Sequence, residues 1–120
     1  MRREPQKLVR DRIPEIVRRS GRRCGVERLD IADYRRALRD KLVEEAIEAA
    51  EARDDAELIR ELADLSEAID ALLETYEIDR ATVSAKQQQR RDERGGFRQR
   101  LKLLWTEDNE ETELSGTEKS

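Results

Sequence analysis

The chain of 120 residues contains no histidine, a single cysteine and only 3% aromatic residues. The missing histidine excludes Ser-His and Cys-His catalytic pairs as well as histidine-ligated metal sites. A lone Cys24 excludes an intramolecular disulfide framework and a cysteine-ligated zinc site. No stretch approaches the roughly 20 apolar residues that cross a bilayer, and the first residues do not resemble a signal peptide. We therefore expect a cytoplasmic protein without a membrane partner, whose chemistry uses carboxylates, cations and hydroxyls.

Charged residues make up 45% of the sequence, and the two signs are segregated. Residues 1–30 carry ten bases and five acids, whereas residues 31–80 carry seven bases and sixteen acids. Residues 81–105 return to seven bases and two acids, and residues 106–120 hold six acids and one lysine. The acidic middle would repel a DNA or RNA polymer, which we therefore do not expect as a partner. Divalent cations held by these acids would reverse that repulsion toward phosphates.

Two long segments have apolar residues at helical spacing, which argues against a wholly disordered chain although only 36% of the residues are hydrophobic. The first predicted helix begins near Asp33 as its N-cap and runs to about Arg53, with apolar residues on two sides. The second is capped by Asp54 and Asp55 and spans roughly residues 56–76. Its apolar stripe is the clearest in the sequence and contains Leu58, Leu62, Leu65, Ile69, Leu72, Leu73 and Tyr76.

Shorter elements are expected on both sides of these helices. A short helix with Pro14 in its first turn should end at Ser20 and Gly21, and a short extended piece could cover residues 26–29. A mostly polar helix is predicted from about residue 79 to 94, where Gly95 and Gly96 stop it. We expect one domain over residues 1–105 and a disordered acidic tail over residues 106–120.

The short connection between the long helices predicts an antiparallel hairpin. A hairpin and a short third helix bury little surface by themselves, so we expect two chains to form a four-helix bundle. The predicted fold class is all-α, assembled as a homodimer or a higher homo-oligomer.

Two pairs of carboxylates accompany the apolar stripes, each pair with a spacing of three residues. At about 100° per residue, Glu45 falls inside the stripe of the first helix and Glu48 lies at its edge. Glu61 and Asp64 flank the stripe of the second helix, and an antiparallel hairpin could bring all four acids to one level. Carboxylates converging near a core would repel one another unless they bind hard divalent cations. A solvated acidic face, with ion pairs such as Lys41 to Glu45, is the alternative.

Two segments carry these acids, namely K-L-V-E-E-A-I-E (residues 41–48) and E-L-A-D-L (residues 61–65). They match the E-x-x-E and E-x-x-D signature of all-α, MazG-like nucleoside triphosphate pyrophosphohydrolases, a family that the sequence resembles. The segments K-L-V-R-D-R-I-P-E (residues 7–15) and E-R-G-G-F (residues 93–97) are similar to the phosphoribosyl-ATP pyrophosphohydrolase-like branch. The resemblance covers about residues 6–104. It implies Mg²⁺-dependent hydrolysis between the α and β phosphates, which yields a nucleoside monophosphate and pyrophosphate.

The resemblance also implies roles for individual acids. Glu45, Glu48, Glu61 and Asp64 would be ligands of Mg²⁺, with Mn²⁺ as a possible substitute. Glu44 and Glu45 are the candidate catalytic carboxylates, and Glu44 would act as an outer-sphere ligand or as the base that orients water. Such hydrolases clear unwanted nucleotides from the cellular pool.

Cations in the two basic flanks are candidates for binding the phosphates of the substrate. Lys7, Arg10 and Arg12 lie in the first flank. The second flank holds Lys86, Arg90 and Arg94, which recur every fourth residue and so share one helix face. A solubilising basic surface is the alternative for each of them. Two other functions stay open for the chain, namely a non-enzymatic dimeric helical interaction or regulatory module and the phosphoribosyl-ATP pyrophosphohydrolase of histidine synthesis.

Overall fold

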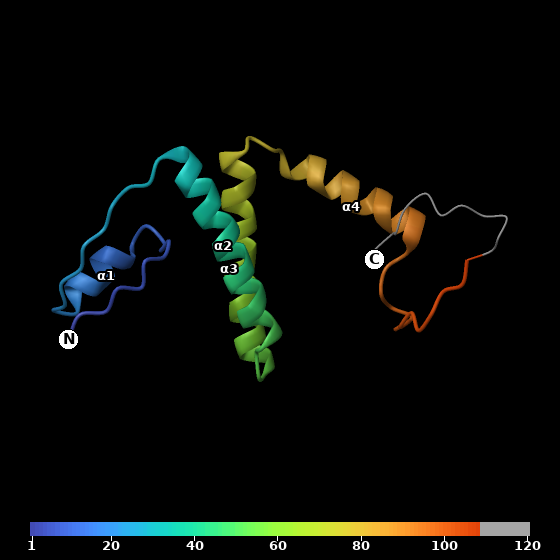
Figure 1. The fold of residues 1–120 in the computed structure, drawn as a ribbon, viewed down its shortest axis with the longest axis horizontal. Coiled ribbons are helices and arrows are strands. Elements are labelled where there is room, and N and C mark those ends of the chain that lie inside the picture. The colour runs from blue at the N-terminus through green and yellow to red at the C-terminus, as the bar shows by residue number, and fades with distance from the viewer. Residues whose placement is uncertain (109–120) are drawn as a thin grey trace. The chain divides into compact units, whose positions relative to one another are not determined.

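The computed structural model describes residues 1–108, which form four α-helices and no strand (Figure 1). The helices are α1 (Ile13–Arg19), α2 (Ile31–Ala50), α3 (Asp55–Thr75) and α4 (Arg80–Arg94). The predicted all-α fold is confirmed for these residues. Among them, no helix is long and apolar enough to cross a membrane. Most of the predicted acidic tail, from residue 109 onward, lies outside the described residues.

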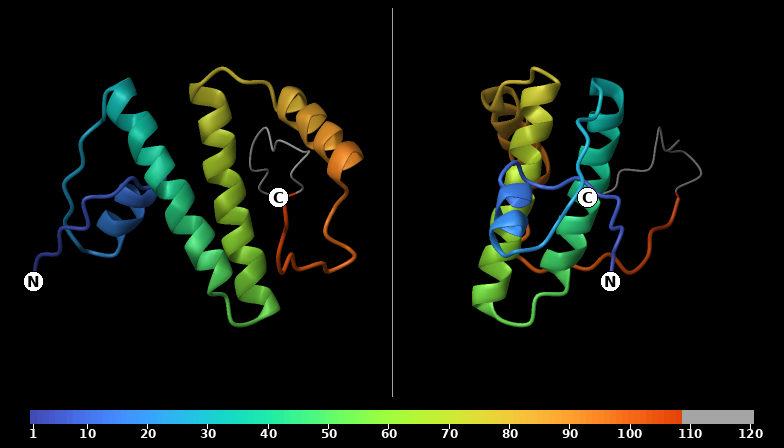
Figure 2. Two further views of the ribbon diagram at one scale, coloured as in Figure 1. Left: turned by 45° about the vertical axis from the view of Figure 1, so that its right-hand side comes forward. Right: turned by 90° about the vertical axis from the view of Figure 1, so that its left-hand side faces the viewer.

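Helices α2 and α3 form the predicted antiparallel hairpin and lie side by side in every view (Figures 1 and 2). The carboxylate of Asp54 caps α3 by accepting a hydrogen bond from the Glu57 N–H at 2.8 Å. The predicted start of α2 is wrong by three residues, because Asp30 and not Asp33 is its N-cap. Asp30 accepts a hydrogen bond from the N–H of Asp33 at 2.8 Å, which places Asp33 in the first turn. The helix also ends at Ala50, before the predicted Arg53.

The hydrophobic core between α2 and α3 is small. Among the described residues, its buried apolar side chains are Leu38 on α2 and Ala68 on α3. Large apolar side chains elsewhere on the same hairpin stay exposed, and these include Val43, Ile47, Ile59 and Leu62. Exposed apolar side chains on a helix pair are typical of a surface that packs against another chain.

Tyr76, at the C-cap of α3, is only partly buried and is not the core residue that its place in the stripe predicted. The guanidinium groups of Arg35 and Arg39 lie 4.4 Å and 5.3 Å from the centre of its ring. Arg39 Nη2 also donates to the tyrosine hydroxyl at 3.0 Å. The reason is position, because the stripe ends where α3 ends and charged side chains of α2 cover the ring instead of apolar ones.

The chain divides into two units, Met1–Ser84 and Ala85–Ser120, and each is considered by itself. In the first unit, Pro14 lies in the first turn of α1, and Gly21 follows its end with a φ of +85°. In the second unit, Gly95 ends α4 with a φ of +81°, a left-handed conformation that glycine adopts without steric cost. Residues 26–29 and 101–108 are neither helix nor strand in the described chain.

Candidate metal centre

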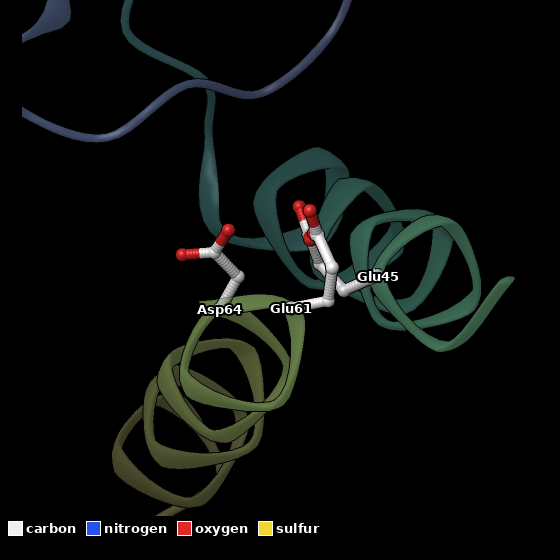
Figure 3. A group of neighbouring side chains, drawn as sticks. All are labelled: Glu45, Glu61 and Asp64. Carbon is white, nitrogen blue, oxygen red and sulfur yellow. The ribbon is translucent and has the colours of Figure 1, made fainter. Parts of the chain in front are cut away.

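Three carboxylates from the two hairpin helices point into the same space (Figure 3). Glu45 comes from α2, and Glu61 and Asp64 come from adjacent turns of α3. One oxygen of each carboxylate lies within 4.8 Å of the others. The antiparallel pairing therefore brings acids from both helices to one level, as their spacing in the sequence predicted.

Glu45 is the most unusual of the three acids because it is buried in the small core, with 5% of the residue exposed. Its Oε1 lies 3.3 Å from the ammonium group of Lys41. Its Oε2 is buried and has no hydrogen-bond partner within the described part of the chain. Buried carboxylates are normally satisfied on both oxygens, because leaving one unpaired costs desolvation energy. Within the described residues no positive or donating group serves this oxygen, and the neighbouring Glu48 carboxylate can pair with Glu45 only by sharing a proton.

The electrostatics of Glu45 agree with its incomplete pairing. Burial raises the pKa of the Glu45 carboxyl above its ordinary value, and the nearby Glu48 carboxylate adds to the rise. Lys41 opposes this change without cancelling it. The pKa of Glu45 is raised because its negative charge is poorly compensated, and a divalent cation would supply the missing compensation.

The three carboxylates are near enough to share one small divalent ion if their side chains draw together. Mg²⁺ binds oxygen ligands at about 2.0–2.1 Å in octahedral geometry, so adjacent ligands are about 3 Å apart and opposite ligands about 4.2 Å apart. The three carboxylate oxygens lie within 4.8 Å of one another, so binding would need side-chain movements that bring them closer to each other. All three ligands would be hard carboxylate oxygens, which Mg²⁺ and Mn²⁺ prefer.

Glu48, the fourth predicted ligand, is exposed on α2 and lies outside this group of three among residues 1–108. Three residues along a helix turn a side chain by about 300°, which leaves it about 60° from its starting direction. Glu45 can therefore face α3 while Glu48 lies at the solvent-exposed edge of the contact between α2 and α3. The Glu48 carboxylate is near enough to Glu45 for its negative charge to raise the pKa of Glu45.

Cations from two parts of the sequence contact the acids of this region. Arg10 Nη2 lies 2.7 Å from Asp64 Oδ1, and Lys7 Nζ lies 3.3 Å from Glu44 Oε1. Lys41 Nζ lies 3.4 Å from the other oxygen of Glu44. Partial burial favours a higher pKa for Glu44, but Lys7 and Lys41 outweigh it and the pKa is lowered. Glu44 is therefore a poorer proton acceptor than an ordinary glutamate.

Lys41, predicted from the sequence only as an ion-pair partner of Glu45, makes that pair at 3.3 Å and is a further residue of the site. It contacts Glu44 and Glu45 together, at spacings of three and four residues along α2. That spacing was visible in the sequence but is common on any charged helix surface. A hollow of about 100 Å³ lies beside these groups and is lined by Gln6, Lys7, Leu8, Ala37, Asp40, Lys41 and Glu44.

Of the other predicted phosphate-binding residues, Arg12 pairs within its own segment and three belong to the second unit. Arg12 is 76% exposed and lies 3.5 Å from Glu15 within its own segment. Lys86 donates to Gln89 at 2.9 Å, and it belongs with Arg90 and Arg94 to the unit that starts at residue 85. Their contact with phosphates stays a prediction from the sequence.

Comparisons of the chain with protein-family models, with curated proteins and with solved structures found no match. The likeness to MazG-like hydrolases accordingly rests on the motifs described above.

Proposed function

We propose that the protein is a Mg²⁺-dependent nucleotide pyrophosphohydrolase, which cleaves a nucleoside triphosphate into a nucleoside monophosphate and pyrophosphate. The observation that carries the proposal is the burial of Glu45 with one unpartnered oxygen, next to Glu61 and Asp64. A solvated acidic face, which is the alternative, does not bury one of its acids in the core. The motifs of residues 7–15, 41–48, 61–65 and 93–97 support the same reaction.

Each residue of the site has a part in this proposal. Glu45, Glu61 and Asp64 would hold the ion, and Glu48, which lies outside their group in the described residues, is the fourth candidate ligand from the sequence. When bound, Mg²⁺ would supply positive charge that favours attack on the α-phosphorus. The oxygen of a water molecule would bond to the α-phosphorus and lose a proton to solvent, while the bond to the bridging oxygen breaks and pyrophosphate leaves with the electron pair. Lys7, Arg10 and Lys41 surround this region with further positive charge for the leaving group.

The assembly that we propose is a pair of hairpins forming a four-helix bundle. Its support is the contrast between a core with Leu38 and Ala68 and the exposed Val43 and Ile47 on the same helix pair. Light scattering after gel filtration measures the mass directly. A chain of 14.1 kDa should run as a species of at least twice that mass, and a monomer at micromolar concentration would refute the pairing.

The activity test is a panel of canonical and modified nucleoside triphosphates with Mg²⁺ or Mn²⁺, analysed for monophosphate and pyrophosphate by chromatography. Glu61→Gln and Asp64→Asn should each lower turnover by orders of magnitude while circular dichroism stays helical. Glu67→Gln is the matched control, since Glu67 is an exposed acid of α3 outside the group of three. If no nucleotide gives a metal-dependent product, the proposed activity is wrong.

The exposed apolar faces favour a second candidate, a non-enzymatic helical interaction module. It predicts that Mg²⁺ with a non-hydrolysable nucleotide leaves the melting temperature unchanged. A clear stabilisation would count against it. If phosphoribosyl-ATP is the substrate, the gene should rescue a histidine auxotroph that lacks this hydrolase, whereas general nucleotide clearance should not.

A further inference from the structure

Arg10 occupies a place where one cation could serve two partners in succession. It lies in the segment before α1, where residues 1–10 form neither helix nor strand. Its guanidinium contacts Asp64 at 2.7 Å, and Asp64 is one of the three clustered carboxylates. Arg10 is 54 residues away from Asp64 in the sequence, so this contact joins the N-terminal segment to the hairpin at the site itself.

The contact is easily exchanged. The side chain of Arg10 is 55% exposed and that of Asp64 is 36% exposed. Ion pairs this open to water contribute little to stability, because solvent screens the charges and the free side chains regain entropy. A divalent ion bound by the same carboxylate would compete for its charge and repel the guanidinium at close range. The released Arg10 would remain next to the ion, where phosphate groups would lie.

On this basis, and resting on the proposed function, we propose that Arg10 exchanges partners during the reaction cycle. In the nucleotide-free protein it neutralises Asp64, and once the ion and the substrate are bound it contacts the pyrophosphate portion of the nucleotide. Arginine suits both partners, since its planar guanidinium binds carboxylates and phosphates in the same two-pronged geometry. Lys41 differs because it is mostly buried, with 21% of its side chain exposed, and contacts two carboxylates at once.

The exchange predicts opposite effects of one substitution on two affinities. In Arg10→Met the ion no longer competes with a guanidinium, so Mn²⁺ should bind about two- to five-fold more tightly, the range of an exposed ion pair. Inorganic pyrophosphate in saturating Mg²⁺ should bind about ten-fold more weakly, because a charge-assisted hydrogen bond is lost. Both dissociation constants are measured on the full chain by isothermal titration calorimetry, and no turnover is needed.

Arg19→Met is the matched control for general loss of positive charge. Arg19 is 70% exposed and pairs with Glu15 on α1, and among the described residues it makes no ion pair with a clustered acid. Both of its affinities should stay within about two-fold of the wild-type values, as expected when an exposed charge is screened. Tighter Mn²⁺ binding in both variants would attribute the effect to net charge and overturn the exchange.

The other outcomes are also decisive. If Arg10→Met weakens the binding of both Mn²⁺ and pyrophosphate, Arg10 only holds Asp64 in position and the exchange is wrong. If neither constant changes, or only one does, Arg10 does not serve two partners. A wild-type chain that binds no Mn²⁺ would contradict the proposed function itself. The proposed exchange of partners by Arg10 would then also be wrong.

Discussion

The substitution Glu45→Gln should make the metal-free protein more stable, although it removes a proposed functional residue. Glu45 is buried, and its Oε2 is unpaired within the described residues. Glutamine keeps the shape of the side chain, and its oxygen can still accept from Lys41. Its amide N–H groups would meet the neighbouring carboxylates as donors, where glutamate presents another negative charge.

The expected gain follows from the group that is removed. An unsatisfied buried polar atom costs about 1–3 kcal/mol, and more when it is charged. Part of this gain is lost because Lys41 gives up a charged partner, although it keeps its contact with Glu44 at 3.4 Å. We therefore expect a net gain in the free energy of unfolding of about 1 kcal/mol at pH 7 in EDTA.

The gain should depend on pH with a defined sign. The folded-state pKa of Glu45 is raised, mainly by burial, so the folded chain binds the proton more tightly than the unfolded chain. The stability that this proton confers is complete below the ordinary value of 4.5 and is lost as the pH rises through the folded-state pKa. Glu45→Gln should abolish that loss, so the difference between the two proteins should grow with pH across this range.

Urea denaturation followed by circular dichroism, at one fixed protein concentration, measures the effect in EDTA and in Mn²⁺. Wild type should gain stability from Mn²⁺, whereas Glu45→Gln should gain far less. Glu67→Gln, an exposed change on α3, should behave as wild type in both conditions. A Glu45→Gln protein that is less stable than wild type in EDTA would refute the argument that the buried carboxylate is a cost.

Three further predictions test other parts of the chain. Lys7 and Lys41 lower the pKa of Glu44 despite its partial burial, so the charged carboxylate stabilises wild type above the ordinary pKa of 4.5 and this stability is lost as the pH falls below that value. Glu44→Gln should remove this contribution, which acid titration followed by circular dichroism measures. Asp54→Ala should cost about 1 kcal/mol in urea denaturation because α3 loses its N-cap, whereas a similar loss in Asp55→Ala would contradict the assignment of the cap. Trp105, the single tryptophan, is 74% exposed, so iodide should quench its fluorescence as it quenches free tryptophan, and protection would show that another surface covers it.

The helices were predictable because their apolar spacing is local information, but the start of α2 was not. Asp30 and Asp33 are both good N-cap residues. The apolar stripe begins only at Leu38, so its spacing does not indicate which of the two caps the helix. The choice is made by backbone conformation, since Asp30 has the extended φ and ψ of a cap while Asp33 is helical.

The candidate site divides in the same way between local and long-range information. The common level of Glu45, Glu61 and Asp64 follows from two helices and a short connection, so spacing could predict it. The exposure of Glu48 depends on how far α2 is rotated about its own axis, which the packing of the hairpin sets. The contact of Arg10 with Asp64 joins residues 54 positions apart in the sequence. The charges of the N-terminal flank could not predict which of its cations contacts Asp64.

The composition of the core gives the strongest reason to connect Glu45 with function. Among the described residues, the buried side chains are Leu38, Ala68 and Glu45. A charged side chain therefore occupies one of the few buried positions in a small core. An apolar residue at position 45 would extend the stripe of α2 and remove an electrostatic cost. Proteins tolerate such a loss of stability mainly where activity requires it. If Glu45→Leu gave a more stable chain that still bound Mn²⁺ as wild type does, this connection between burial and function would be wrong.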